Sequence, residues 1–120
     1  IAAVAECVPI GAEDVPALVD FARGKGVEPV GAGPEAPLAL GLADACAAAG
    51  IRCFGPTAAA ARLEASKAFT REVATAAGAP GARWARFEDA DAARAHIQAR
   101  GAPIVVKADG LAAGKGVVIA

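Results

Sequence analysis

Residues 104–120 read Ile104-Val-Val-Lys-Ala-Asp-Gly-Leu-Ala-Ala-Gly-Lys-Gly-Val-Val-Ile-Ala120. Two short apolar runs, Ile104 to Val106 and Val117 to Ile119, are rich in β-branched residues, as buried strands tend to be. Three glycines and two lysines lie between the runs. Glycines leave backbone N–H groups uncovered, so such a loop can curl around an anion at little steric cost. The stretch therefore predicts a β-hairpin with a glycine-rich, phosphate-binding tip.

Lys107 is the residue that most favours a phosphate ligand here, because an ammonium group beside so apolar a run needs an anionic partner if it is buried. The spacing excludes a Walker P-loop: Gly110 and Gly114 are one residue too close, and Gly116 replaces the hydroxyl residue that binds magnesium. A P-loop also opens a helix, whereas residues 117–120 favour a strand. The alternative is an ordinary hairpin turn with solvated lysines, although such turns use about two to five residues and this loop uses about eight.

The composition is that of a globular protein. Lysine and arginine number 12 against 13 acidic residues, for a net charge of -1, which is no signature of a nucleic-acid partner. No apolar run approaches the roughly 20 residues of a membrane-spanning helix. The three cysteines form no C-x-x-C pair, so a reducing, cytoplasmic location fits best. Because the chain starts without methionine and stops inside an apolar run, we expect an internal segment of a longer protein.

The first half of the chain predicts alternating strands and helices, as in a βαβ unit. The strand over residues 28–32 is weak by itself, because Pro29 lacks an N–H donor and Gly31 has no side chain to pack. Its position between two helices supports the prediction. We expect strands over residues 2–10, 28–32 and 52–54, a helix with Val15, Leu18, Val19 and Ala22 on its apolar face that ends at Gly24 and Gly26, and a second helix over residues 37–50.

The second half predicts three helices and an edge strand. Thr57 caps a helix through Leu63, a second helical pattern follows Lys67 and closes at Gly78 and Pro80, and Asp89 caps a helix through Arg100. Residues 82–87 predict an edge strand, and the only histidine, His96, is expected to lie on an exposed helix without a catalytic role.

Residues 31–36, Gly31-Ala-Gly-Pro-Glu-Ala36, match the relaxed dinucleotide fingerprint G-x-G-x-x-G/A. Pro34 removes an N–H from the would-be pyrophosphate site, and residues 52–54 provide no acidic residue for a ribose. Glu35 is better explained as a polar group at the carboxyl end of a parallel strand, where ligands of α/β proteins bind. The alternative is a carboxylate that stabilises a helix N-terminus. Lys67 by itself would be interpreted as a solvated lysine.

With these pieces in place, the chain resembles the phosphoribosylamine–glycine ligases, ATP-grasp enzymes of purine biosynthesis, from about residue 11 to residue 120. The motifs are GPEAPL (33–38), FGPT (54–57), LEASKAFT (63–70) and GAPIVVKADGLAAGKGVVIA (101–120). The resemblance implies an α/β fold in three parts: a Rossmann-like (pre-ATP-grasp) portion over residues 1–60, linker helices over residues 61–80, and the start of an ATP-grasp domain over residues 81–120. Where the family has an apolar strand before GPE, this chain has Pro29-Val-Gly-Ala32.

The resemblance also implies the site residues. Lys67 and Lys107 would contact the nucleotide phosphates, with Lys107 as the catalytic residue, and the glycine-rich hairpin would close over them. The implied ATP-binding set is Lys67, Lys107, Asp109, Gly110, Leu111, Ala112, Ala113, Gly114, Lys115 and Gly116. The implied substrate-binding set is Gly33, Pro34, Glu35, Ala36 and Pro37. No metal ligand is expected within the chain, because the residues that bind Mg²⁺ in the family would follow residue 120.

The implied reaction is ATP-dependent ligation of glycine to 5-phosphoribosylamine through glycyl phosphate, giving glycinamide ribonucleotide, ADP and phosphate. The implied partners are these small molecules, in a monomer that could be fused to or associated with other purine-pathway enzymes. The 120-residue chain alone is expected to be inactive and to bind ATP weakly. The alternatives are another ATP-grasp carboxylate–amine ligase of purine metabolism and a non-catalytic nucleotide-binding module.

Overall fold

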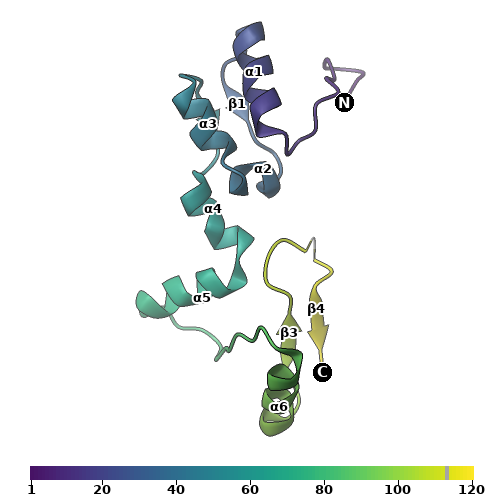
Figure 1. The fold of residues 1–120 in the computed structure, drawn as a ribbon, viewed down its shortest axis with the longest axis vertical. Coiled ribbons are helices and arrows are strands. Elements are labelled where there is room, and N and C mark those ends of the chain that lie inside the picture. The colour runs from purple at the N-terminus through teal and green to yellow at the C-terminus, as the bar shows by residue number, and fades with distance from the viewer. Residues whose placement is uncertain (113) are drawn as a thin grey trace. The chain divides into compact units, whose positions relative to one another are not determined.

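The computed structural model describes residues 1–112 and 114–120 (Figure 1). Helices and strands are mixed along the chain, which confirms the predicted α/β class. The chain forms two compact units, Ile1–Arg62 and Leu63–Ala120. Within the described residues, no helix is long and apolar enough to cross a membrane.

The first unit is built on a parallel pair of strands. Helix α1 (Val15–Lys25) precedes β1 (Val30–Gly31), and α2 (Glu35–Ala39) and α3 (Leu42–Ala48) connect β1 to β2 (Cys53–Phe54). Val30 lies opposite Cys53, and Gly31 lies opposite Phe54. Parallel strands require a crossover connection, and α2 and α3 provide it. The predicted βαβ arrangement is therefore confirmed, with shorter strands than the sequence suggested.

Helix α1 begins at Val15 and ends before Gly26, as predicted, but Gly24, the other predicted stop, lies inside it. The Asp14 side chain accepts a hydrogen bond from the Ala17 backbone N–H at 3.1 Å, which satisfies a donor that the first turn leaves free. Gly26 follows the helix with φ 63°, a left-handed conformation that glycine adopts without strain. Val19 and Ala22 form the buried face.

The prediction of one helix over residues 37–50 was wrong. Two helices are present, and the break falls at Gly41, whose φ of 91° interrupts the right-handed backbone. Pro37 lies inside α2 rather than at the start of a longer helix. Because the chain turns at Gly41, Leu38 and Leu42 both reach buried positions from separate helices.

The core of the first unit consists of two small clusters. Val19, Leu42 and Cys46 form one of them, and Leu38, Ala43 and Ala61 form the other. A Cβ atom built on Gly55 would lie 2.5 Å from Cδ2 of Leu38. The chain after β2 therefore packs directly on α2, and glycine at position 55 permits this close approach.

The predicted strand over residues 2–10 is not formed. This stretch contains a turn and irregular backbone, and Ile1 and Val4 are 94% and 89% exposed. A strand is stabilised by pairing with a neighbour, and neither described sheet includes this segment. Its apolar composition alone was therefore a misleading signal.

The second unit contains helices α5 (Lys67–Ala76) and α6 (Ala90–Arg100) and an antiparallel hairpin of β3 (Val105–Lys107) and β4 (Val117–Ile119). Helix α4 (Ala58–Ala65) precedes them and spans the border between the two units. The predicted cap of α6 is confirmed, because the Asp89 carboxylate accepts from the Ala92 N–H at 2.7 Å.

The edge strand predicted over residues 82–87 is absent. These residues are exposed and have no strand partner in the described sheets. Trp84 instead donates to the Thr75 hydroxyl at 3.4 Å. The Phe87 ring lies 5.0 Å from the His96 ring, centroid to centroid. Helix α6 has no buried residue, as predicted, and His96 itself is half-buried.

The hairpin pairs as predicted, with Lys107 opposite Val117 and Val105 opposite Ile119. The prediction that its strands are buried was wrong, since Val105 and Ile119 are 51% and 76% exposed. The two strands form a sheet of their own, and in the described part of this unit no second layer covers it.

Candidate functional site

The glycine-rich loop between β3 and β4 is tightly closed at its base. The Ala108 N–H donates to the Gly116 carbonyl at 2.7 Å. A Cβ atom on Gly116 would lie 2.9 Å from Cβ of Ala112 and 3.1 Å from Cβ of Ala108, so this position has no room for a side chain. Gly110 and Gly114 have φ values of 89° and 75°, which favour glycine. A strand follows the loop, which agrees with the exclusion of a P-loop.

The N-terminus of α5 is the second part of the site. An α-helix leaves its first backbone N–H groups without partners inside the helix. The Ser66 hydroxyl accepts from the Phe69 N–H at 3.1 Å. The Asp109 carboxylate, from the glycine-rich loop, accepts from the N–H groups of Lys67 at 2.7 Å and Ala68 at 3.3 Å. The Ser66 hydroxyl also donates to Asp109 at 3.1 Å. Two side chains distant in sequence thus share the cap.

The surroundings of Asp109 favour its charged form. Partial burial acts to raise the pKa of this carboxyl, but hydrogen bonds from the N–H groups of Ala68 and Gly110, the Ser66 hydroxyl and the Lys67 N–H outweigh that effect and lower it. The partial positive charge at a helix N-terminus acts in the same direction. Asp109 is therefore an anion at neutral pH, directed at α5.

The ammonium group of Lys67 also contacts the loop. Its Nζ donates to the Gly110 carbonyl at 2.7 Å, and the residue is half-buried. Lys107 and Lys115 are exposed, at the end of β3 and in the loop. Among the described residues, Lys107 forms no ion pair. The structure thus brings Lys67, Asp109 and Gly110 together, across 42 or more positions of sequence.

The other residues of the predicted ATP-binding set lie in the loop between β3 and β4. Leu111 is exposed, Ala112 is half-buried and Gly114 is exposed. Ala113 lies outside the described residues. Sequence reasoning missed Ser66, which both caps α5 and contacts Asp109. A serine directly before an apolar helical pattern is a recognisable capping signal and could have indicated it.

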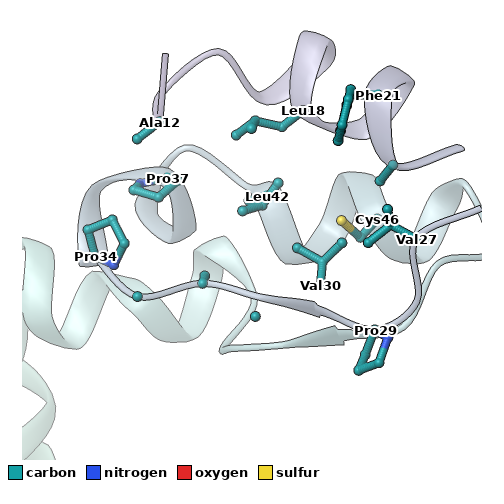
Figure 2. A pocket seen from close by; sticks show the side chains of 14 residues that line it. Ala12, Leu18, Phe21, Val27, Pro29, Val30, Pro34, Pro37, Leu42 and Cys46 are labelled. Atoms are coloured by element: carbon teal, nitrogen blue, oxygen red, sulfur yellow. The ribbon is translucent and has the colours of Figure 1, made fainter. Parts of the chain in front are cut away.

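The predicted substrate-binding residues lie after β1 in the first unit. Pro34 is the N-cap residue of α2, Glu35 is the exposed first residue of that helix, and Pro37 is buried. A pocket of about 340 Å³ lies between α1, β1, α2 and α3, and Figure 2 shows the side chains that line it. Gly33, Pro34 and Pro37 line it, whereas Glu35 and Ala36 do not.

The pocket itself is apolar. None of the described residues that line it carries a charge, and Leu18, Phe21 and Val30 are among them. A phosphorylated sugar would gain no ionic contact inside it. Glu35, the residue after the pocket-lining Pro34, carries an exposed carboxylate.

The glycine-rich hairpin carries one lysine on its first strand and has a second lysine held against its loop, and comparison with known proteins assigns the class of this element. Residues 65–120 match the family model described as "Phosphoribosylglycinamide synthetase, ATP-grasp (A) domain". The element is therefore part of an ATP-grasp domain. Residues 1–64 match the model described as "Phosphoribosylglycinamide synthetase, N domain". The chain belongs to the phosphoribosylglycinamide synthetase family.

Individual relatives agree with this assignment. The chain is 56% identical over 120 residues to a protein of Brucella melitensis named phosphoribosylamine–glycine ligase. Proteins with the same name from Vibrio cholerae and Escherichia coli K12 are 54% and 50% identical over 113 residues, 94% of the chain. The chain spans 28% of the Brucella protein and 26% of the other two.

Proposed function

We propose that this chain serves an ATP-dependent ligase that joins glycine to 5-phosphoribosylamine and releases ADP and phosphate. The observation that supports this most is the pairing of the glycine-rich loop with Lys67 through two hydrogen bonds, at 2.7 Å each. The relatives named phosphoribosylamine–glycine ligase match both units of the chain, so the proposal covers the first unit as well as the second.

In this proposal the ATP phosphates bind between Lys67, Lys107 and the loop residues 109–116. An ammonium group has three N–H donors, and one of those of Lys67 is engaged by Gly110, so two remain for phosphate oxygens. Lys107 places a further positive charge where the loop begins and is the proposed catalytic residue. Transfer of a phosphoryl group depends mainly on such positioning and charge stabilisation.

The chemistry proceeds in two steps. A carboxylate oxygen of glycine bonds to the γ-phosphorus of ATP, and the bond to ADP breaks, giving glycyl phosphate. The amine of phosphoribosylamine then attacks the acyl carbon, loses a proton, and releases phosphate that retains the glycine oxygen. Lys67 and Lys107 hold the negative charge that moves onto the phosphate oxygens during the first step.

The substrate-binding residues in the proposal are Gly33, Pro34, Glu35, Ala36 and Pro37. They follow the carboxyl end of β1, which is where ligands of parallel α/β sheets bind. The parallel β1–β2 pair with its helical crossover supports a Rossmann-like portion over residues 1–60. For the rest of the chain we propose linker helices over residues 61–80, which lie largely within the segment that matches the ATP-grasp model, residues 65–120, and the body of the ATP-grasp domain from residue 81.

Magnesium accompanies ATP in this proposal. Mg²⁺ is held through carboxylates and phosphate oxygens, yet among the described residues no three His, Cys, Asp or Glu side chains lie together as metal ligands. We propose that the protein groups that hold the ion lie outside this chain. We further propose a cytoplasmic, monomeric enzyme that acts on small molecules, alone or joined to other purine-pathway enzymes.

Isotope transfer tests the proposal. A full-length ligase that contains these residues is run with glycine labelled with ¹⁸O in both carboxyl oxygens. The expected result is one labelled oxygen in inorganic phosphate per turnover, together with ADP. Unlabelled phosphate with ADP would indicate a different phosphoryl acceptor, and AMP with pyrophosphate would indicate an adenylate intermediate. ATP binding without any turnover would indicate a non-catalytic module.

A further inference from the structure

We propose that Asp109 is a positioning residue of the nucleotide site, which holds Lys67 against the glycine-rich loop and does not itself contact ATP. This inference rests on the proposed function, because it takes Lys67 as a ligand of the ATP phosphates. It gives Asp109 a different role from that of the other loop residues in the ATP-binding set.

The charge of Asp109 is directed at α5. A carboxylate beside the ATP phosphates would repel them at every step of the reaction. The Asp109 oxygens are instead directed at donors of α5: Oδ1 accepts from the backbone of Lys67 and Ala68, and Oδ2 accepts from the Ser66 hydroxyl. These partners keep the negative charge on the helix, where the dipole stabilises it.

Lys67 is held at two points by the loop. Its backbone N–H is bound to Asp109 and its side-chain Nζ is bound to Gly110, each at 2.7 Å. Neighbouring residues of the loop thus hold both ends of one lysine. A lysine side chain otherwise has large rotamer freedom, so this arrangement orders the ammonium group before a phosphate arrives.

Apolar packing contributes little to the contact between the loop and α5. Ala68 is the one buried apolar residue of the second unit among those described, and β3 and β4 are exposed. The loop therefore meets α5 mainly through hydrogen bonds. Removing the Asp109 carboxylate deletes the bonds to Ser66, Lys67 and Ala68 together.

A double-mutant cycle in a full-length ligase that contains these residues tests the proposal. Asp109→Ala should raise the KM for ATP by about 10- to 100-fold, the cost of a misplaced binding group, and leave the KM for glycine unchanged. In a Lys67→Ala background the same substitution should have less than about a threefold effect, because residues that act through one another are not additive. Asp109→Asn, which keeps one acceptor oxygen, should be intermediate.

Asp89→Ala provides the matched control. Asp89 also caps a helix through one N–H at 2.7 Å, but α6 carries no residue of the site. This variant should lower the melting temperature and leave the KM for ATP unchanged. Equal effects of Asp89→Ala and Asp109→Ala on that KM would reduce Asp109 to a general stabilising residue and overturn the proposal, as would additive effects of Asp109→Ala and Lys67→Ala.

Amide hydrogen exchange separates this inference from the proposed function. In the 120-residue chain, Asp109→Ala should speed exchange at Lys67 and Ala68 by about tenfold or more relative to Phe69, whose N–H is held by Ser66. Unchanged exchange would show that the hydrogen bonds from Lys67 and Ala68 to Asp109 are not formed, and this result would not depend on the activity of the enzyme. If exchange changes but the parent ligase forms no ADP, the proposed function fails and the role of Asp109 in an ATP site fails with it.

Discussion

In both units, the free backbone N–H groups at the start of a helix are capped by a similar pair of side chains. At α4 the Asp44 carboxylate accepts from the Ala58 N–H at 2.7 Å, and the nearby hydroxyl of Thr57 accepts at 3.4 Å from a later N–H. At α5 the remote carboxylate is Asp109 and the local hydroxyl is that of Ser66. In each unit a serine or threonine next to the helix and an aspartate far along the chain satisfy the free N–H donors.

The difference lies in what the aspartate is attached to. Asp44 belongs to α3, between the buried residues Ala43 and Cys46, so its position is fixed by a core that exists without the cap. Asp109 belongs to a loop whose flanking strands are exposed. The same capping bond therefore adds to packing in the first unit, whereas in the second it is the main contact between the loop and α5.

The largest effect is expected where the second unit meets ATP. In a full-length ligase, Lys107→Ala should reduce kcat/KM for ATP by a factor that corresponds to about 2–4 kcal/mol, because a charge aimed at the transferred phosphoryl group is lost. Steady-state kinetics measure it. Lys25→Ala, an exposed lysine at the end of α1 in the first unit, is the matched control and should be nearly silent. Equal losses in the two variants would remove Lys107 from the site.

A packing change should have its effect in the first unit alone. Gly55→Ala places a Cβ 2.5 Å from a methyl carbon of the buried Leu38, so the free energy of unfolding should fall by about 1–3 kcal/mol. Urea denaturation measures it. Gly24→Ala, with nothing within 4 Å of its Cβ and a position inside α1, should be neutral or stabilising. A Gly55→Ala protein as stable as its parent would show that residues 54–57 do not pack on α2.

Much of the fold could be predicted from local chemistry. The caps at Thr57 and Asp89 follow from residues that stand directly before helical patterns, and the hairpin follows from its β-branched runs and glycines. Gly41 was harder to predict, because a glycine within an apolar helical pattern can be tolerated, and its left-handed conformation is decided by how α2 and α3 pack.

The failed strands have a common cause. Residues 2–10 and 82–87 have suitable side chains, but a strand depends on a partner that a single segment does not reveal. The same limit applies to the candidate site. The residues themselves indicated the glycine-rich loop, and only the family resemblance indicated Lys67. The role of Asp109 as the connection between them depends on a contact across 42 positions, which no local pattern encodes.

Removing the aspartate that caps α4 in the first unit tests whether the two caps have different roles. Asp44→Ala should lower the free energy of unfolding by about 1 kcal/mol, the usual value of a helix N-cap. Because α4 begins far along the chain from the loop and carries no proposed ATP ligand, the KM for ATP in the full-length ligase should not change. A weaker affinity for ATP in this variant would show that the first unit also orders the nucleotide site.

The smallest expected effect is the loss of stability at low pH. It comes from Asp109 in the second unit and from Glu28 in the first. The hydrogen bonds on Asp109 lower its pKa, so its contribution to stability is fully present above the pKa of an unfolded aspartate, about 3.9, and is lost as the pH falls through the lower folded value. In the first unit, the Arg52 hydrogen bond and charge lower the pKa of Glu28 in the same direction. The free energy of unfolding, measured with urea between pH 2 and pH 6, should therefore depend less on pH in Asp109→Asn, which removes the contribution of Asp109. It should also depend less on pH in Arg52→Gln, which removes the contribution of Glu28.

NMR titration of the Lys67 amide would then follow the Asp109 carboxyl directly, with a midpoint below that of an unfolded aspartate. A midpoint at or above the pKa of an unfolded aspartate would mean that the hydrogen bonds from α5 do not stabilise the charged form of Asp109. The caps of Asp44 and Asp109 would then differ in more than the segment to which each aspartate belongs.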